Sequence, residues 1–231
     1  MATSTTSLTD SVDALIRSRQ TTRAFRPDAV PRAHLVEILE TARTAPSTFN
    51  TQPWKIHVLT GEAKRLLSEV LVRAHTENAC PPYAAIPNPA PEGCAARQDD
   101  FGRRYYAVLG IDRTDMAARA RQTARNFVFF DAPVGIIFTI DNSLTKHSWL
   151  DYGLFLQNLI IAAQARGLAT CPQVSFVRYQ SVIAAQLGLA ANESVVCGMS
   201  LGYPDSQAAL NNMRMPREPL DGFVKWHTLG K

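Results

Sequence analysis

Two short segments near the start of the chain carry side chains that could hold an anionic ligand with a flat ring. The first covers residues 17–25 and reads Arg-Ser-Arg-Gln-Thr-Thr-Arg-Ala-Phe. Guanidinium groups donate paired hydrogen bonds to phosphate, and the hydroxyl and amide groups between them suit the oxygens of a polyol or heterocycle. The alternative interpretation of this composition is a solvated basic end of a helix.

The second segment covers residues 46–54 and reads Pro-Ser-Thr-Phe-Asn-Thr-Gln-Pro-Trp. Its two prolines stiffen the chain and hold the amide and hydroxyl groups between them in place. Rigid polar groups beside a strand form a hydrogen-bonding edge for a planar ligand. An ordinary connection between a helix and a strand is the alternative, so neither segment identifies a ligand when taken alone.

Several known catalytic signatures are missing from the sequence. No GxGxxG follows a predicted strand, and neither GxxxxGK[ST] nor HExxH occurs. The five histidines are dispersed and the four cysteines form no CxxC pair, so we expect neither a metal site nor a redox dithiol. If the chain is an enzyme, a bound cofactor must therefore carry its chemistry.

Hydrophobic periodicity predicts an α+β fold with a mixed central sheet flanked by helices. The predicted strands cover residues 55–60, 134–140 and 195–201. The predicted helices cover residues 12–16, 31–45, 62–77, 97–125 (as one or two helices), 147–166 and 179–187. Residues 147–166 are apolar around nearly their whole circumference, which predicts a fully buried central helix. Gly167 should end that helix in a left-handed cap.

The remaining segments complete a single predicted domain over residues 1–231. Residues 1–10 are polar and rich in threonine and serine, so we expect a disordered tail. Residues 80–91 are rich in proline and are expected to be irregular, and Cys171 before Pro172 is expected in a loop, where it could be partly exposed. Residues 203–231 show little periodicity and are expected to pack on a neighbouring subunit.

Charge and hydropathy exclude two classes of partner. The net charge of +4 suits an anionic ligand, but the arginines are scattered rather than massed in a stripe, so we expect no nucleic acid. No run reaches the roughly 18 to 20 apolar residues of a membrane span, so we expect no membrane contact. The first ten residues lack the basic-then-apolar pattern of a signal peptide, so we expect a cytoplasmic protein.

Taken together and in this order, the two segments resemble the nitroreductase family of flavoproteins. In that family an Arg-x-[Ser/Thr]-x-[Arg/Lys]-x-[Phe/Tyr] stretch, here residues 19–25, precedes a Pro-Ser-x-x-Asn-x-Gln-Pro-Trp loop, here residues 46–54, by about one helix. The further matching segments are residues 151–159, 167–172, 198–204 and 214–220. The resemblance implies a nitroreductase-like fold, an intertwined homodimer, bound FMN, and NADH or NADPH as co-substrate.

The resemblance also implies roles for individual residues in binding FMN. Arg19, Gln20 and Thr21 would contact its phosphate and ribityl chain, and Arg217 with Arg214 would close on the phosphate. Arg23 matches a basic residue beside the pyrimidine side of the flavin, where a fixed cation stabilises the negative charge of the reduced ring. The loop residues implied to contact the cofactor, the first four of them from the partner subunit, are Pro46, Ser47, Thr48, Asn50 and Gln52. The loop implied to present one backbone N–H to the flavin N5 consists of Pro172, Gln173, Val174 and Ser175.

Residues 103–106, 110–113 and 124–130 look most like members that reduce nitrobenzene or nitrobenzoate. Arg103, Tyr105 and Phe130 are therefore the candidate substrate contacts, with helix surface and core aromatics as the alternative. Residues 80–98 depart from the family pattern as an insertion-like segment, so the substrate pocket is less defined than the flavin site.

The resemblance leaves three functions open. The leading hypothesis is a ping-pong reductase that takes nitroaromatic compounds to hydroxylamines, with no catalytic side chain and with water as the proton source. The second keeps the flavin and reduces a quinone or activated alkene, or dehalogenates a halophenol. The third is a flavin-binding protein without turnover.

Overall fold

The computed structural model describes residues 7–82, 85 and 87–227. Its sheet has four strands: β1 (Lys55–Thr60), β2 (Val134–Asp141), β3 (Ala169–Gln173) and β4 (Glu193–Gly202). The strand order is β1-β2-β4-β3. The seven α-helices of the described residues are α1 (Leu8–Ser18), α2 (Arg32–Ala42), α3 (Gly61–Thr76), α4 (Glu92–Val108), α5 (Met116–Ala124), α6 (Lys146–Gln164) and α7 (Gln180–Leu187).

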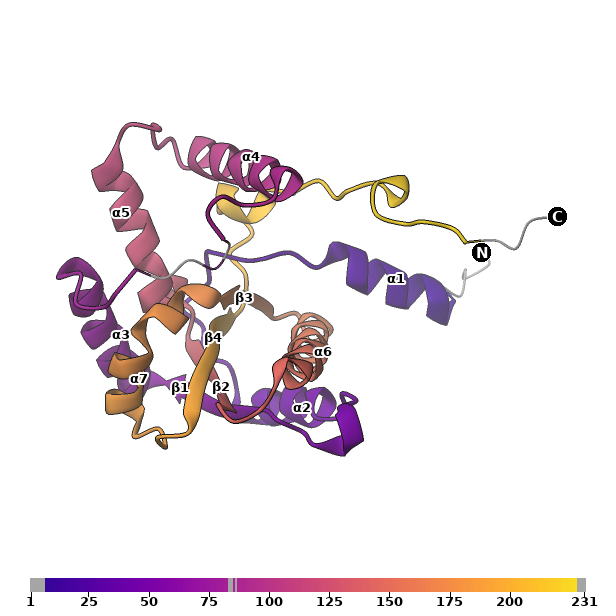
Figure 1. The fold of residues 1–231 in the computed structure, drawn as a ribbon, viewed down its shortest axis with the longest axis horizontal. Coiled ribbons are helices and arrows are strands. Elements are labelled where there is room, and N and C mark those ends of the chain that lie inside the picture. The colour runs from indigo at the N-terminus through magenta and orange to yellow at the C-terminus, as the bar shows by residue number, and fades with distance from the viewer. Residues whose placement is uncertain (1–6, 83–84, 86, 228–231) are drawn as a thin grey trace.

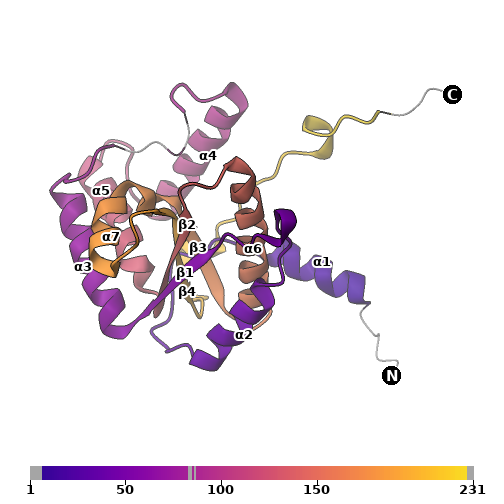
Figure 2. The same cartoon turned by 60° about the horizontal axis from the view of Figure 1, so that its bottom comes forward.

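Helices cover both faces of the sheet (Figures 1 and 2). β2 is buried along nearly its whole length, and alternate side chains enter two different cores. Ile136 and Phe138 pack in the core that includes α2 and α6, whereas Ile137 packs in the core that includes α3 and α7. The sheet is thus the rigid middle layer against which the segments around it are held.

The α+β class is confirmed, and the pairing of the strands corrects one detail of the prediction. The three ladders of the sheet are antiparallel, where a mixed sheet was expected. Within the described residues, parallel pairing occurs as an isolated bridge between Thr21 and Thr170. Hydrophobic alternation reports which face a side chain occupies, but it does not report the direction of the neighbouring strand.

Two predictions about loops and tails are wrong. Residues 8–10 lie inside α1 instead of a disordered tail, because Ser7 caps the helix by accepting a hydrogen bond from the Asp10 backbone N–H at 3.1 Å. The first six residues of that predicted tail lie outside the described residues. Cys171 and Pro172 lie in strand β3 and not in a loop, and the Cys171 side chain is buried.

Helix α6 also differs from expectation. The helix was predicted to be fully buried, but in the single chain Trp149, Leu150 and Leu154 are exposed on one side of it. The predicted left-handed cap at Gly167 is confirmed, with φ of 71°. In Figure 1, α1 and the C-terminal tail, described as far as residue 227, extend from the body toward the same side as α6. None of the helices in the described part of the chain has the length and apolar character needed to cross a membrane.

Packing against the sheet leads to a test of the core. A methyl group added at Gly198 in β4 would lie 2.6 Å from the ring of Phe176. Gly198→Ala should therefore lower the free energy of unfolding by about 1–3 kcal/mol through overpacking. The measurement is urea denaturation followed by circular dichroism.

The matched control is Gly102→Ala in α4, where nothing lies within 4 Å of the added methyl group. Alanine is the better helix former, so this variant should be as stable as the parent or more stable. Equal unfolding midpoints for the two variants would contradict the packing described around Gly198.

Candidate functional site

The end of α1 brings one predicted phosphate ligand to a defined place. The Gln164 side-chain amide on α6 donates to the Leu15 carbonyl at 2.9 Å and to Ser18 Oγ at 2.6 Å. These bonds fix the last turn of α1 on the central helix. The next residue, Arg19, is therefore presented at a constant position beside α6.

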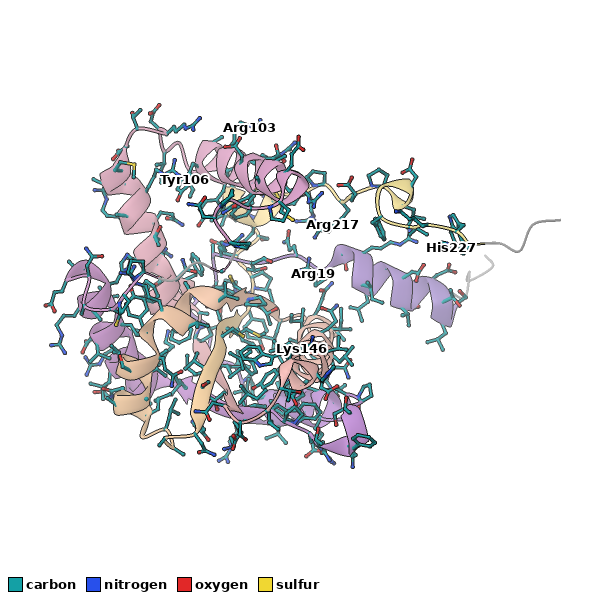
Figure 3. The ribbon with its side chains drawn as sticks, in the orientation of Figure 1. Arg19, Arg103, Tyr106, Lys146, Arg217 and His227 are labelled. Carbon is teal, nitrogen blue, oxygen red and sulfur yellow. The ribbon has the colours of Figure 1, made fainter. Side chains whose placement is uncertain are left out.

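Arg19 and Arg217 come together although they lie near opposite ends of the chain (Figure 3). Burial, and then the charge of Arg217, lower the pKa of the Arg19 guanidinium. Arg217 is held by bonds from its Nη1 to the Met215 and Pro216 carbonyls at 3.0 and 3.1 Å. No ion pair with a carboxylate is recorded for either arginine within the described residues. Two adjacent cations without an acid form a site for an anion.

The residues after Arg19 run beside strand β3. The Thr22 backbone N–H donates to the Thr170 carbonyl at 3.0 Å, so this extended segment continues the edge of the sheet. Beside it lies a cavity of about 200 Å³, and its lining includes Arg19, Gln20 and Thr170. Gln20 Oε1 and Thr22 Oγ1 are buried there without a hydrogen-bond partner in the described structure. Buried polar atoms in this state are ready to bond a ligand.

Arg23 is anchored by a residue that the sequence did not single out. Its backbone N–H donates to Asn211 Oδ1 at 2.9 Å, and Asn211 Nδ2 donates to the carbonyls of Ala24 and Asp205 at 2.7 and 2.9 Å. The Asn211 side chain is buried. It therefore ties the Arg23 segment to the C-terminal segment, and Arg214 adds a 3.3 Å bond to the Asn211 carbonyl.

The loop of residues 46–53 is held in a strained conformation. Phe49, Asn50 and Gln52 have φ values of 50°, 57° and 45°, a region that side chains disfavour. Asp151, only 4% exposed on α6, accepts bonds from Thr48 N at 3.0 Å and Thr48 Oγ1 at 3.3 Å. Such strain persists only where surrounding contacts impose it, and it is typical of functional loops.

Other bonds inside the loop fix its polar side chains. Ser47 Oγ accepts from the Gln52 backbone N–H at 3.0 Å, and Gln52 Nε2 donates to Asn50 Oδ1 at 3.1 Å. Phe49 is 97% exposed at the tip. Neither these residues nor Pro46 lines the cavity beside Arg19. The loop is thus prepared for contacts outside the Arg19 cavity of its own chain.

The residues predicted to face the flavin N5 occupy the end of β3 and the turn after it. Gln173 is buried, and its side chain is engaged within the protein: Nε2 donates to the Asn126 carbonyl at 2.8 Å, and Oε1 accepts from Ser200 Oγ at 2.8 Å. Pro172 and Val174 are exposed, and Ser175 Oγ is buried without a recorded partner. Any ligand contact from Gln173 must therefore come from its backbone.

Ser200, which donates the bond to Gln173 Oε1, lies in a sequence motif of hydrolases, but its position excludes that chemistry. Residues 198–202 spell Gly-Met-Ser-Leu-Gly, which matches the GxSxG pattern of hydrolases. In those enzymes the serine sits on a sharp turn between a strand and a helix. Here Ser200 lies inside β4, fully buried. It is a structural residue of the sheet and not a nucleophile.

The three candidate substrate contacts are not brought together. Arg103 is exposed on the outer side of α4 and pairs with Asp100 (Figure 3). Phe130 is 1% exposed, so its ring packs in the core, which was the alternative to a substrate contact. Tyr105 lies beneath the Arg23 guanidinium, with 5.2 Å between its ring centroid and the guanidinium carbon. No group of His, Cys, Asp and Glu side chains among the described residues is arranged to hold a metal.

Comparison with known proteins agrees with this geometry. Residues 16–203 match the model of the nitroreductase family. The chain is 51% identical over 223 residues to a 4-nitrobenzoate reductase of Pseudomonas putida, covering 96% of this chain and 97% of that protein. It is 42% identical over 216 residues to a chloronitrobenzene nitroreductase of Comamonas testosteroni, covering 92% and 95%.

A solved structure has the same fold along its whole length. The FMN-dependent nitroreductase NfnB from Mycobacterium smegmatis in complex with NADPH superposes with a TM-score of 0.91 at 34% identity. The superposition covers 96% of this chain and all of that chain.

The paired arginines lead to a ligand-binding test. Arg217→Ala should weaken FMN binding by about 10- to 100-fold, because a hydrogen bond to a charged group contributes about 1.5–3 kcal/mol. Riboflavin lacks the phosphate, so its affinity should change little. Fluorescence titration of both flavins measures the two effects.

The control is Arg43→Ala, which removes an exposed arginine that pairs with Glu40 away from this cavity. It should leave both affinities at the parental value. Equal weakening of FMN and riboflavin by Arg217→Ala would show that Arg217 does not bind the phosphate.

Proposed function

Because this chain belongs to the nitroreductase family, we propose that it is an FMN-dependent enzyme that reduces nitroaromatic compounds with NADH or NADPH. The proposed substrates are of the nitrobenzene and nitrobenzoate class, and the proposed products are hydroxylamines. Relatives named for 4-nitrobenzoate and chloronitrobenzene support this substrate class. The whole chain forms one FMN-binding domain in this proposal.

The observation that carries the proposal is the approach of Arg19 and Arg217, which lack a neutralising carboxylate in the described structure. This pair fits the phosphate of FMN. The unpartnered oxygens of Gln20 and Thr22 lie beside it, and they fit the polar part of the ribityl chain. The residues present therefore match the chemistry of the cofactor.

When bound, FMN supplies hydride transfer between the nicotinamide and the substrate. The protein's own residues would bind and orient this cofactor. The residues that would hold the phosphate side of FMN are Arg19, Gln20, Thr21, Arg214 and Arg217. Arg23 would place a positive charge beside the flavin ring. In this proposal solvent water supplies the protons, and no side chain acts as a general acid or base.

The two co-substrates bind in turn in this proposal, because both must reach the same face of the flavin. We propose that the second wall of the site is the loop of residues 46–52 from a partner subunit. The loop presents its polar groups away from the Arg19 cavity of its own chain, which supports a contribution to a second site. Exposed apolar side chains on α6 and on the tail support a partner as well.

The reaction is tested with a substrate panel. The purified protein should be yellow, and NADH or NADPH should bleach it. Nitrobenzoates should then be reduced faster than quinones, activated alkenes or halophenols, and initial rates against both co-substrates should give parallel double-reciprocal lines. Bleaching without turnover of any compound would instead support a flavin-binding protein, and activity confined to quinones or halophenols would overturn the proposed substrate class.

The dimer is tested on helix α6. Leu150 is 70% exposed in the single chain, so Leu150→Glu should place a charge in the proposed interface and dissociate the dimer. FMN should be lost at the same time, because each site needs the partner subunit. Sedimentation velocity and flavin absorbance measure the two effects.

Leu66→Glu is the matched control. Leu66 is 39% exposed on α3, and it belongs neither to α6 nor to the tail. It should leave a yellow dimer. A monomeric parent protein that keeps its FMN would contradict the shared site.

A further inference from the structure

The guanidinium group of Arg23 rests on two stacked aromatic rings of helix α4. Its carbon lies 5.4 Å from the centroid of Phe101 and 5.2 Å from the centroid of Tyr105. The two rings are themselves stacked, with centroids 5.4 Å apart and planes inclined by 21°. These separations are within the range in which a ring face attracts a cation.

The ring pair is fixed by its helix and by a neighbour. Phe101 and Tyr105 are four residues apart, so α4 places them on one face. Gln122 on α5 donates a 2.7 Å bond to the Tyr105 hydroxyl, and the Tyr105 ring is buried. Burial raises the pKa of Tyr105, so the phenol stays neutral.

No carboxylate neutralises Arg23 within the described residues. Asp100 is adjacent to Phe101 on α4, but its carboxylate pairs with Arg103 and with Arg104 Nε at 2.8 Å. Arg23 also lies near the Cys171 thiol, and burial raises the pKa of that thiol to about 11, so it is neutral as well. Arg23 is thus held by neutral groups that leave its charge uncompensated.

This arrangement has an electrostatic consequence. An acid that anchored the arginine would cancel most of its field at a distance, because the two charges would form a dipole. A ring face attracts the cation through its quadrupole and leaves the net charge unchanged. Helix α4 therefore holds Arg23 in place and preserves its full positive field.

We propose that Phe101 and Tyr105 are positioning residues that hold Arg23 as an uncompensated cation beside the flavin ring and thereby favour the reduced form of FMN. This inference rests on the proposed function, which places Arg23 at the pyrimidine side of the flavin. It assigns Tyr105 to the cofactor through Arg23, instead of to the substrate.

The test is the midpoint potential of FMN bound to the holoenzyme, measured by equilibration with a redox dye. Phe101→Leu and Tyr105→Leu should each lower the potential, since the affinity for reduced relative to oxidised FMN should fall roughly fivefold, the effect of one partly desolvated cation–π contact. Tyr105→Phe keeps the ring and loses only the bond to Gln122, so it should retain the parental potential.

Tyr106→Leu is the matched control on the same helix. The guanidinium of Arg119 lies 4.1 Å from the centroid of the Tyr106 ring, and this ring meets Tyr105 edge-on with centroids 5.3 Å apart. Tyr106 is not one of the two rings beneath Arg23, so its loss should leave Arg23 in place and the potential unchanged. Unchanged potentials in folded Phe101→Leu and Tyr105→Leu, or an equal shift in Tyr106→Leu, would overturn the inference. Phe101 is half-buried, so Phe101→Leu decides alone if Tyr105→Leu does not fold.

A second measurement does not depend on flavin. Cys171 is 1% exposed, so release of Arg23 should increase its exposure more than the loss of the nearby cation reduces its thiolate fraction. Alkylation of Cys171 by iodoacetamide, followed by peptide mass spectrometry, should therefore be several-fold faster in both leucine variants than in the parent and in Tyr106→Leu. If the parent protein binds no FMN, the proposed function fails, and the alkylation rates still decide whether the two rings hold Arg23. Equal rates in all variants would overturn the clamp.

Discussion

Positive charge that is held in place without a neighbouring acid is the constraint on which the site depends. Arg19 and Arg217 repel each other, and burial together with this repulsion lowers the pKa of Arg19. The fold tolerates this pair because α6 fixes the end of α1 and the tail carbonyls fix Arg217. A dianionic phosphate would remove the repulsion, so cofactor binding and local stability are coupled at this point.

The same principle extends from the phosphate end to the ring end of the site. Asn211 holds the backbone of Arg23, and the rings of α4 hold its side chain. Helix α4 is also joined to the tail by the 2.8 Å ion pair of Arg97 with Glu218, next to Arg217. The helix and the tail therefore contact arginines at both ends of the proposed flavin site. A displacement of α4 would change the positions of the arginines at both ends.

Exposed apolar side chains give the structure its second constraint. Leu150 on α6 and Phe49 in the strained loop are exposed in the single chain, as are Phe223 and Trp226 on the tail. Large apolar groups gathered on projecting segments are typical of surfaces that meet a partner. In the proposed dimer the loop would be covered and would complete a neighbour's site, which gives its strained backbone a function.

Local patterns determined much of this protein without reference to the fold. Strand β1 was predicted at its observed bounds because its alternation is bounded by the Gly61 turn, and α2 was limited by Pro31 and Pro46. The two polar segments, together with the further matching segments in the same order, indicated the family. Such signals are local in the chain, since they depend on backbone sterics and on side-chain periodicity.

Only the tertiary structure decided the remaining features. Strand β3 was predicted to be a loop because it contains Pro172. It forms because it lies at the edge of the sheet, where a residue without a backbone N–H is tolerated. The exposed side of α6 was missed because the helix is apolar around its circumference, and periodicity alone does not report which of its apolar side chains other elements of the chain cover. Arg19 lies near Arg217, and Arg23 contacts Phe101 and Tyr105, although these residues are far apart in the sequence. Only the packing around the sheet brings their charges and rings together.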